Sequence, residues 1–243
     1  MIAAARKGLD KVLEGLNPDH VEEQRRVNVD NMLPTLNLLF QQIVEQFTDV
    51  EDALENVIPY ILSNNKTISS PQEINAFFSA VFGDPDNQDK LKTYLPGLYA
   101  SGLIQQSYNH GYNNFQLTTR DMQSPWGIGF GLKGSPESPL LLTVDGPAGH
   151  VFGGRSVYVH YKFMSILGVF IADGVKDCSY ILQDRIPKAH EKCSGCTFKT
   201  SRQDLLDHYK NLVNQLTFHD DPFPNTLWYI HPDGGEQQID LEH

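Results

Sequence analysis

The stretch LLLTVDGPAGHVFGGRSVYVH, residues 140–160, decides the expected fold because two short strand-like pieces flank a run of glycines. Similar pieces rich in β-branched and aromatic residues follow as SYILQ and TFK. The steps between the strand centres Leu142, Tyr158, Ile181 and Phe198 are 16, 23 and 17 residues. Such spacing is typical of a solenoid whose rungs stack on one another. The pattern predicts a right-handed single-stranded β-helix.

The glycines of this stretch fit the corners of such a coil. A corner turns within two or three residues and often needs a positive φ, which glycine adopts without the steric penalty of a Cβ atom. We therefore predict structural corners at four positions: Gly146, Gly149, Gly153 and Gly154.

The segment VDGPAGHVFGGRSVYV, residues 144–159, resembles the GXGXG rung of the β-helix at the C-terminal end of glutamate synthase large subunits. The C subunit of formylmethanofuran dehydrogenase belongs to the same repeat family. The resemblance covers roughly residues 95–200. It implies a β-helix that serves as scaffold and packs between domains, and it brings no catalytic residues with it.

The chain before this region has helical spacing of its apolar residues. Pro34 can open one helix, Asp49 can cap the next, and Pro59 should kink or end that helix near Tyr60. The sequence Ser69-Ser70-Pro71 predicts the N-terminal cap of a further helix. We expect an α-helical domain over residues 1–88.

A cluster of turn-forming residues, Gly83 to Asn87, marks the expected domain break, and a short helix is predicted from Asp89 to Leu95. Residues 203–216 return to helical spacing, and Leu227 to Ile230 predict a last strand. The predicted fold class is therefore α+β. An α-helical domain precedes a β-helix, residues 89–240, which a C-terminal helix and strand cap.

Residues 98–118 also allow a different interpretation, the end and wing of a winged helix. Basic residues are absent between Tyr94 and Thr119, which argues against DNA contact there. A winged fold of this kind could still bind protein.

Charge and composition limit the partners. The net charge is −11 and the pI is near 5.2, which disfavours nucleic acid. The sequence has no run of 18 apolar residues, and charges interrupt its start, so we expect no membrane association and a cytoplasmic location. The odd count of 3 cysteines fits a reducing compartment.

Cys178, His190, Cys193 and Cys196 give the spacing C-x11-H-x2-C-x2-C. Two thiols separated by two residues can share one tetrahedral ion, so a structural zinc site is one interpretation. The other is that Cys178 and Cys196, each preceding a strand, stack as small buried side chains.

Two further patterns suggest chemistry. His150 and His160 could approach each other to form an acid/base or metal pair, although ordinary packing histidines explain them as well. The glycines of GIGFG, residues 127–131, suggest a phosphate loop, but GK[ST] does not follow them.

The sequence thus predicts a non-catalytic scaffold or protein-interaction module whose partner is another protein or a second copy of the chain. The alternative is an enzyme, or an accessory subunit of a redox or amidotransfer enzyme, with its site on a solenoid groove or at the domain junction. The pattern assigns no catalytic residue and no cofactor other than the zinc just described.

Overall fold

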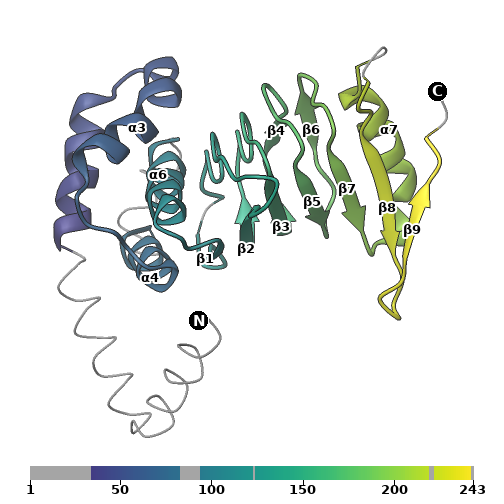
Figure 1. Ribbon diagram of the computed structural model, residues 1–243, viewed down its shortest axis with the longest axis horizontal. Coiled ribbons are helices and arrows are strands. Elements are labelled where there is room, and N and C mark those ends of the chain that lie inside the picture. The colour runs from purple at the N-terminus through teal and green to yellow at the C-terminus, as the bar shows by residue number, and fades with distance from the viewer. Residues whose placement is uncertain (1–33, 83–93, 123, 219–221, 242–243) are drawn as a thin grey trace, which may run out of the picture.

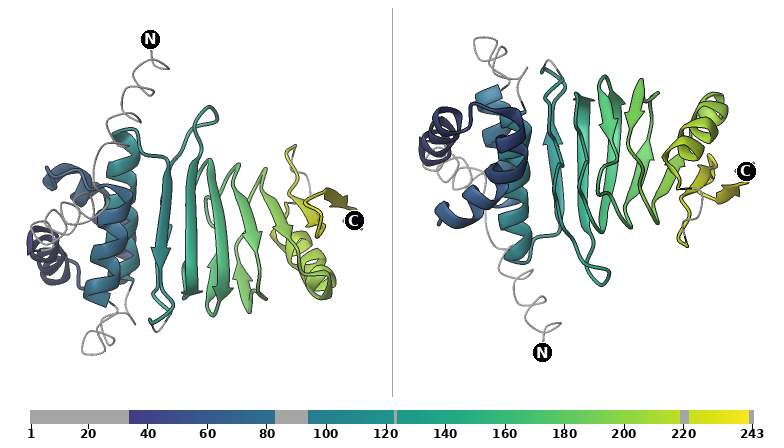
Figure 2. Two further views of the ribbon diagram at one scale, coloured as in Figure 1. Left: turned by 90° about the horizontal axis from the view of Figure 1, so that it is seen from below. Right: turned by 90° about the horizontal axis from the view of Figure 1, so that it is seen from above.

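The computed structural model describes residues 34–82, 94–122, 124–218 and 222–241. Helices gather at one end, a sheet extends away from them, and one more helix lies near the far end (Figure 1). The strands lie side by side in chain order, as Figure 2 shows from two sides. The predicted break at 83–87, the helix expected from Asp89, and the chain before residue 34 lie outside the described residues, apart from Tyr94 and Leu95.

A seven-stranded sheet is the main β element. Its neighbouring strands are parallel except for the last pair, β8 and β9, which are antiparallel. In order across the sheet the strands are β1 (Asn114–Thr118), β2 (Leu140–Ala148), β3 (Val159–Ile166), β5 (Ser179–Leu182), β7 (Thr197–Thr200), β8 (Thr226–Ile230) and β9 (Glu236–Ile239). A separate parallel pair consists of β4 (Val169–Ile171) and β6 (Lys188–His190).

The register of the parallel strands aligns one row of apolar side chains on the inner face of the sheet. This inner row consists of Phe115, Leu142, Tyr161, Tyr180, Phe198 and Leu227. Its members are at most 1% exposed. The rings of Tyr161 and Tyr180 stack at 5.1 Å, and those of Tyr180 and Phe198 at 5.2 Å. The row therefore forms the centre of the hydrophobic core.

The helices begin where their caps predict. Asp49 accepts hydrogen bonds from the second and third residues of α3 (Val50–Asn64), and Ser70 and Glu73 form a reciprocal capping box at the start of α4 (Pro71–Phe82). Pro59 was predicted to kink or end its helix near Tyr60, and the helix does not end there, since α3 continues to Asn64. The helix continues past the proline with its buried face, Ala53, Val57 and Ile61, packed on α6.

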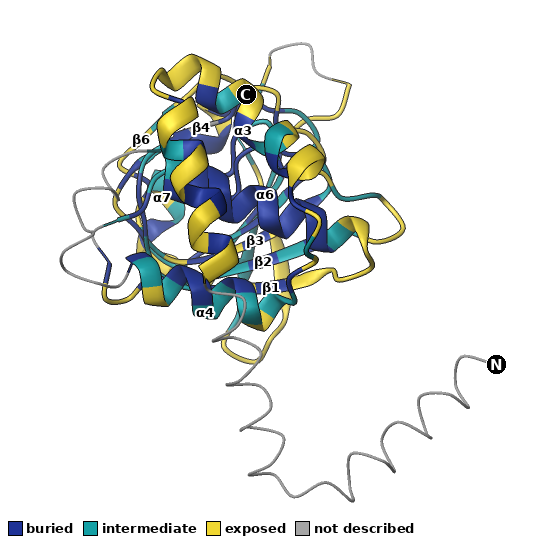
Figure 3. Cartoon of the chain, turned by 90° about the vertical axis from the view of Figure 1, so that its left-hand side faces the viewer, coloured by how far each residue is buried: buried dark blue, intermediate teal, exposed yellow. Residues whose placement is uncertain are grey.

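Helix α6 (Leu95–Asn109) lies at the centre of the helical end and is almost entirely buried (Figure 3). Its glycines allow close packing on both sides. A Cβ at Gly97 would lie 1.9 Å from the carbonyl oxygen of Trp126, and one at Gly102 would lie 2.3 Å from Ile61 of α3. Ser101 Oγ accepts a hydrogen bond from the Gly129 amide at 2.9 Å. Helix α6 thus joins the other helices to the β region.

Helices also cover parts of the sheet. Helix α4 packs beside the edge strand β1, and Asn75 Oδ1 accepts a hydrogen bond from the Thr118 amide at 2.7 Å. Near the opposite end, the 3-10 turn η2 (Gln203–Leu205) leads into α7 (Leu206–Leu216), which packs on β8 and β6. At β1 this packing covers part of the backbone that an edge strand leaves unpaired, whereas β8 is paired on both sides and β9 is the other edge.

The prediction of a right-handed β-helix over residues 89–240 is wrong. The first residues expected to join it, Leu95 to Asn109, form α6, and the described strands form one mostly parallel sheet that ends in an antiparallel hairpin. The physical reason lies in the segments between the strands. Turns and glycines at positive φ limit their pairing to β4 with β6 and to isolated bridges, so they form no further continuous sheet.

The described core is one continuous cluster from Leu36, in the helix 34–46, to Leu227 of β8. Helix α6, which follows the predicted domain boundary in sequence, packs against α3, which precedes it. The division at residue 88 stays a prediction, because the residues around it lie outside those described. Within the described ranges, every helix is too short or too polar to cross a membrane.

Candidate binding groove

Helix α3 carries two neighbouring apolar rows with different surroundings. The first row, Ala53, Val57 and Ile61, is at most 2% exposed and packs inside the molecule. The second row is half-buried or exposed and is here called the outer row of α3: Leu54, Ile58 and Leu62. Its last member is 38% exposed. An apolar row on the open side of a helix is a candidate contact surface.

The outer row forms one wall of a groove of about 610 Å³. The opposite wall consists of three segments that connect strands of the sheet, and it includes Phe130, Val157 and Gly174. Gly131 brings the two walls together, because its φ is +70° and a Cβ there would lie 3.1 Å from Ile58 Cδ1. The groove therefore has the volume and apolar lining typical of binding clefts, which often form where two parts of a protein meet.

Two lysines follow the far wall of the groove in register. Parallel bridges align Lys133 with Val157 and Val157 with Lys176, and we call these three residues the basic row. Both lysines are exposed. Among the ion pairs of the described residues, neither ammonium group has a carboxylate partner. The main chain of Lys133 is fixed by the side chain of Gln105, which accepts from its amide at 2.7 Å and donates to its carbonyl at 3.1 Å.

Arg155 bridges the two walls. Its guanidinium pairs with Glu55 on α3, and its Nε lies 3.0 Å from Asp173 Oδ2. The guanidinium carbon also lies 5.6 Å above the Phe130 ring. Hydrogen bonding to Glu55 and then to Asp173 raises the pKa of Arg155, so its charge is engaged within the protein. The ammonium groups of Lys133 and Lys176, in contrast, pair with no carboxylate of the described residues.

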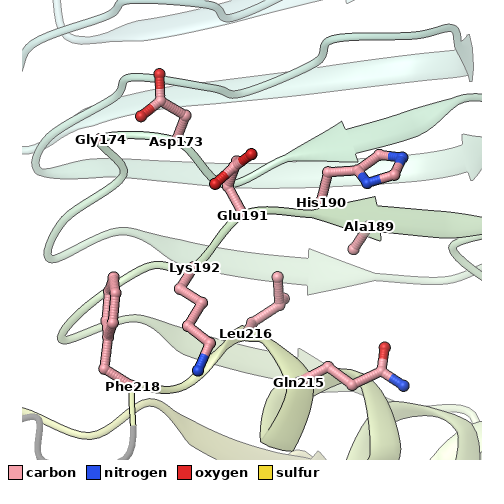
Figure 4. Close-up of a pocket in the computed structure, with 9 residues that line it drawn as sticks. All are labelled: Asp173, Gly174, Ala189, His190, Glu191, Lys192, Gln215, Leu216 and Phe218. Carbon is pink, nitrogen blue, oxygen red and sulfur yellow. The ribbon is translucent and has the colours of Figure 1, made fainter.

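A second hollow, of about 520 Å³, adjoins the groove at Asp173 and Gly174. His190, Glu191 and Lys192 line it from β6 and the turn after it, as the close-up in Figure 4 shows. In that view, the side chains of Asp173 and His190 point away from each other. Lys192 Nζ lies 5.5 Å from the centre of the Phe218 ring. The hollow extends the depression towards the end of α7 and brings no acid/base pair together.

The residues predicted to bind zinc lie in two environments. The thiols of Cys178, Cys193 and Cys196 are at most 2% exposed, whereas His190 is exposed at the end of β6. Cys178 and Cys196 immediately precede the paired residues Ser179 and Thr197, so they occupy equivalent positions in neighbouring strands. Within the described part of the chain, His, Cys, Asp and Glu side chains form no group of three or more that could hold a metal ion.

The buried thiols make local contacts. The Cys178 thiol donates to the carbonyl of Lys176 at 3.2 Å, and the Cys196 thiol donates to that of Ser194 at 3.4 Å. Burial raises the pKa of Cys178, while hydrogen bonding with Cys196 and burial raise that of Cys193. These contacts suit neutral thiols packed in the core, whereas zinc binds the thiolate.

The structure does not bring His150 and His160 together. The His150 ring packs edge-on against Trp126 at 4.5 Å, and its Nδ1 accepts a hydrogen bond from the Val169 amide at 3.3 Å. His160 instead lies exposed on β3, two residues from the next outward side chain, Lys162. The acid/base pair considered from the sequence has no geometric support here.

The glycine amides of the segment 127–131 are already engaged within the protein. Its glycine amides donate to the carbonyl of His150 at 2.9 Å, to Ser101 Oγ at 2.9 Å and to the carbonyl of Gly154 at 2.7 Å. The glycines serve close packing against α6 and the neighbouring segments.

The four predicted corner glycines take different roles. Gly149, Gly153 and Gly154 lie between β2 and β3, and Gly153 has a φ of +64°. Gly146 lies inside β2, where its φ is +133° and the pairing with β3 shifts register between Val144 and Pro147. It marks an irregularity of the strand.

Comparisons with protein-family models, with curated proteins and with solved structures find no match for this chain. The resemblance to the GXGXG domain of glutamate synthase therefore stays a prediction.

Sequence reasoning missed the groove and its lysines. One signal was present, because the apolar residues of α3 come in adjacent pairs, at 53–54, 57–58 and 61–62. A helix with one buried face commonly carries an apolar stripe about 100° wide, so these pairs point to a second contact surface only together with the 38% exposure of Leu62.

Proposed function

We propose that this chain is a non-catalytic protein-interaction module and that its partner binds in the groove beside α3. The outer row of α3, half-exposed in a groove of about 610 Å³, is the observation that carries the proposal. An apolar centre with a polar rim is the usual composition of a protein contact surface. Here Lys133 and Lys176 supply part of that rim.

The surroundings of the reactive side chains support a non-catalytic role. The Ser156 hydroxyl lies 2.7 Å from the Tyr161 hydroxyl and 2.9 Å from the Gly129 carbonyl oxygen, so it acts inside the core. Arg155 is engaged by two carboxylates. The alternative is an enzyme or accessory subunit with a site at the junction, and it stays a prediction. Within the described residues, we find no acid and base that converge on one point in support of it.

The remaining expectations about partners follow from charge and composition. A net charge of −11 disfavours nucleic acid as the partner, and we propose a cytoplasmic protein that does not bind membranes. A second copy of the chain is the other partner class that the sequence left open.

A structural zinc on Cys178, His190, Cys193 and Cys196 also stays a prediction. Its test is the metal content of the purified full chain, followed by a chelator. Stoichiometric zinc whose removal lowers the melting temperature would support it, because bound metal stabilises only the folded state.

Site-specific crosslinking tests the interaction role. In one variant a photoreactive phenylalanine replaces Leu62 in the groove. In the control variant it replaces Leu38 in the helix 34–46, whose side chain is 67% exposed. We expect a protein that crosslinks at Leu62 alone. That protein, once purified, should bind the wild type and should lose affinity by about tenfold or more with Leu62→Glu, since a buried carboxylate replaces an apolar contact.

The control variant Leu38→Glu should bind as the wild type does. The proposal would be overturned if nothing crosslinks at Leu62, or if the captured protein binds Leu62→Glu and wild type equally well. If the captured protein is the chain itself, the interaction is self-association, and light scattering should then report a dimer that Leu62→Glu dissociates.

A further inference from the structure

We infer that the segment bound in the groove is an amphipathic helix with acidic residues beside its apolar face. The inference rests on the proposed function and adds the shape and charge of the partner. Three observations carry it: the length of the outer row of α3, the engaged backbone of the opposite wall, and the two lysines of the basic row, which pair with no carboxylate of the described residues.

The length of the groove matches two turns of a helix. Leu54 and Leu62 are eight residues apart on α3, which corresponds to about 12 Å along the helix axis. The opposite wall spans three paired segments at the level of the basic row, or about 10 Å at the usual strand spacing. A helix that places apolar side chains at every third or fourth position can fill such a groove.

The backbone of the opposite wall favours a helix over an extended strand. The Val157 amide donates to the Leu132 carbonyl at 3.0 Å, and the Val157 carbonyl accepts from Gly134 at 2.8 Å. The Lys176 amide likewise donates to Ser156 at 2.9 Å. A strand that joins a sheet edge needs free main-chain groups, whereas a helix satisfies its own and docks through side chains.

The charge of the groove selects an acidic partner. Lys133 and Lys176 stand on either side of Val157, two strand spacings or about 10 Å apart at the backbone. Residues seven apart on a helix are separated by about 10.5 Å along its axis. Two carboxylates at that separation on the partner can therefore meet the two ammonium groups, whereas Arg155 is already paired.

Peptide selection on the full-length chain tests the inference. The probe is a phage-displayed library of random peptides of about 16 residues, long enough for four helical turns. Selection on the wild type is paired with depletion on Leu62→Glu, so that only peptides that need the groove remain. We expect the selected peptides to share apolar residues at helical spacing with Asp or Glu between them, and to become helical by circular dichroism on binding.

Charge reversal then separates the inference from the proposed function. The double variant Lys133→Glu/Lys176→Glu should weaken the selected peptides about tenfold or more, and higher salt should weaken them in the wild type. The control is Lys162→Glu, an exposed lysine on β3 outside the groove, which should change little. Thermal melts of all variants establish that each is folded.

The outcomes are distinct. Three outcomes would overturn the inference and leave the interaction role standing. The peptides that need Leu62 could be basic, could lack apolar residues at helical spacing, or could bind the double charge-reversal variant as tightly as the wild type. A library that yields no peptide dependent on Leu62 would overturn the inference as well, and together with a failed crosslinking experiment it would remove the groove as an interaction site.

Discussion

Two rows of apolar side chains distinguish the core of this protein from its groove. The inner row of the sheet, represented by Tyr161, Tyr180 and Phe198, is at most 1% exposed and stacks ring on ring. The outer row of α3 consists of equally apolar side chains, yet Leu62 is 38% exposed. The difference shows that apolar character alone does not assign a residue to folding or to binding. The surroundings of an apolar side chain decide whether it serves folding or binding, and mutation can measure its contribution to stability.

The largest effect is expected at the centre of the inner row. Tyr180→Ala removes a ring that stacks on both neighbours, and it should lower the free energy of unfolding by about 3–5 kcal/mol because a cavity remains in the core. Tyr180→Phe keeps the ring and loses only the hydroxyl bond to the Gly153 carbonyl, for a loss of about 1 kcal/mol. Chemical denaturation of both variants measures this, and equal losses would contradict stacking as the main contribution.

A smaller effect is expected where backbone segments touch. A Cβ at Gly168 would lie 2.0 Å from the Gly149 carbonyl carbon, so Gly168→Ala must push two chain segments apart. Overpacking of this kind usually costs about 1–3 kcal/mol. The matched control is Gly235→Ala in the β8–β9 turn, where the nearest atom is the Asp233 carboxylate oxygen at 3.2 Å, the end of a side chain and no part of the backbone. If both variants melt at the same temperature, the close approach has no energetic consequence.

The local elements of the core region were readable from the sequence. Asp49 and the pair Ser70 and Glu73 form caps because their short polar or acidic side chains reach free amides in the first turn. The strand pieces around Leu142 and Phe198 are strands of the same sheet. Such features depend on neighbours in sequence, so the sequence predicts them well.

Features set by distant contacts were not readable. Pro59 was expected to kink or end its helix, but α3 continues to Asn64, with Val57 and Ile61 buried on either side of the proline. The strand spacing suggested a β-helix because it gives the number of residues between successive strands. It does not say how the segments between those strands pair with one another. The groove depends on which side of α3 faces the segments around Phe130 and Val157, and one sequence gives no measure of that.

The stability of the fold should also fall in mild acid, by less than in the core variants. Burial lowers the pKa of the half-buried His208, and the nearby Arg185 lowers it further. His160 is exposed on β3, yet partial desolvation of its ring and the nearby Lys199 lower its pKa in the same direction. The unfolded chain, with an ordinary pKa near 6.5, then binds protons more readily than the folded one. Stability is therefore complete above about pH 6.5 and declines as the pH falls towards the depressed folded values.

Urea unfolding at about pH 7.5 and pH 5.5 measures this loss of stability, because the two pH values lie on either side of the ordinary histidine pKa. The double variant His160→Gln/His208→Gln should lose less stability over that interval than the wild type. An identical loss in the two proteins would assign the pH dependence to other groups.

The smallest effect on stability is expected in the groove, where it tests the comparison most directly. Ile61 and Leu62 are neighbours on α3, but Ile61 is 0% exposed and packs on Gly102, whereas Leu62 is 38% exposed in the outer row. Ile61→Ser should lower the free energy of unfolding by about 2–5 kcal/mol, since it leaves a cavity and buries a hydroxyl. Leu62→Ser should change it by no more than about 0.5 kcal/mol, as surface substitutions usually do. If Leu62→Ser destabilised the chain as much as Ile61→Ser, the outer row would belong to the core, and its apolar character would then need no binding partner to explain it.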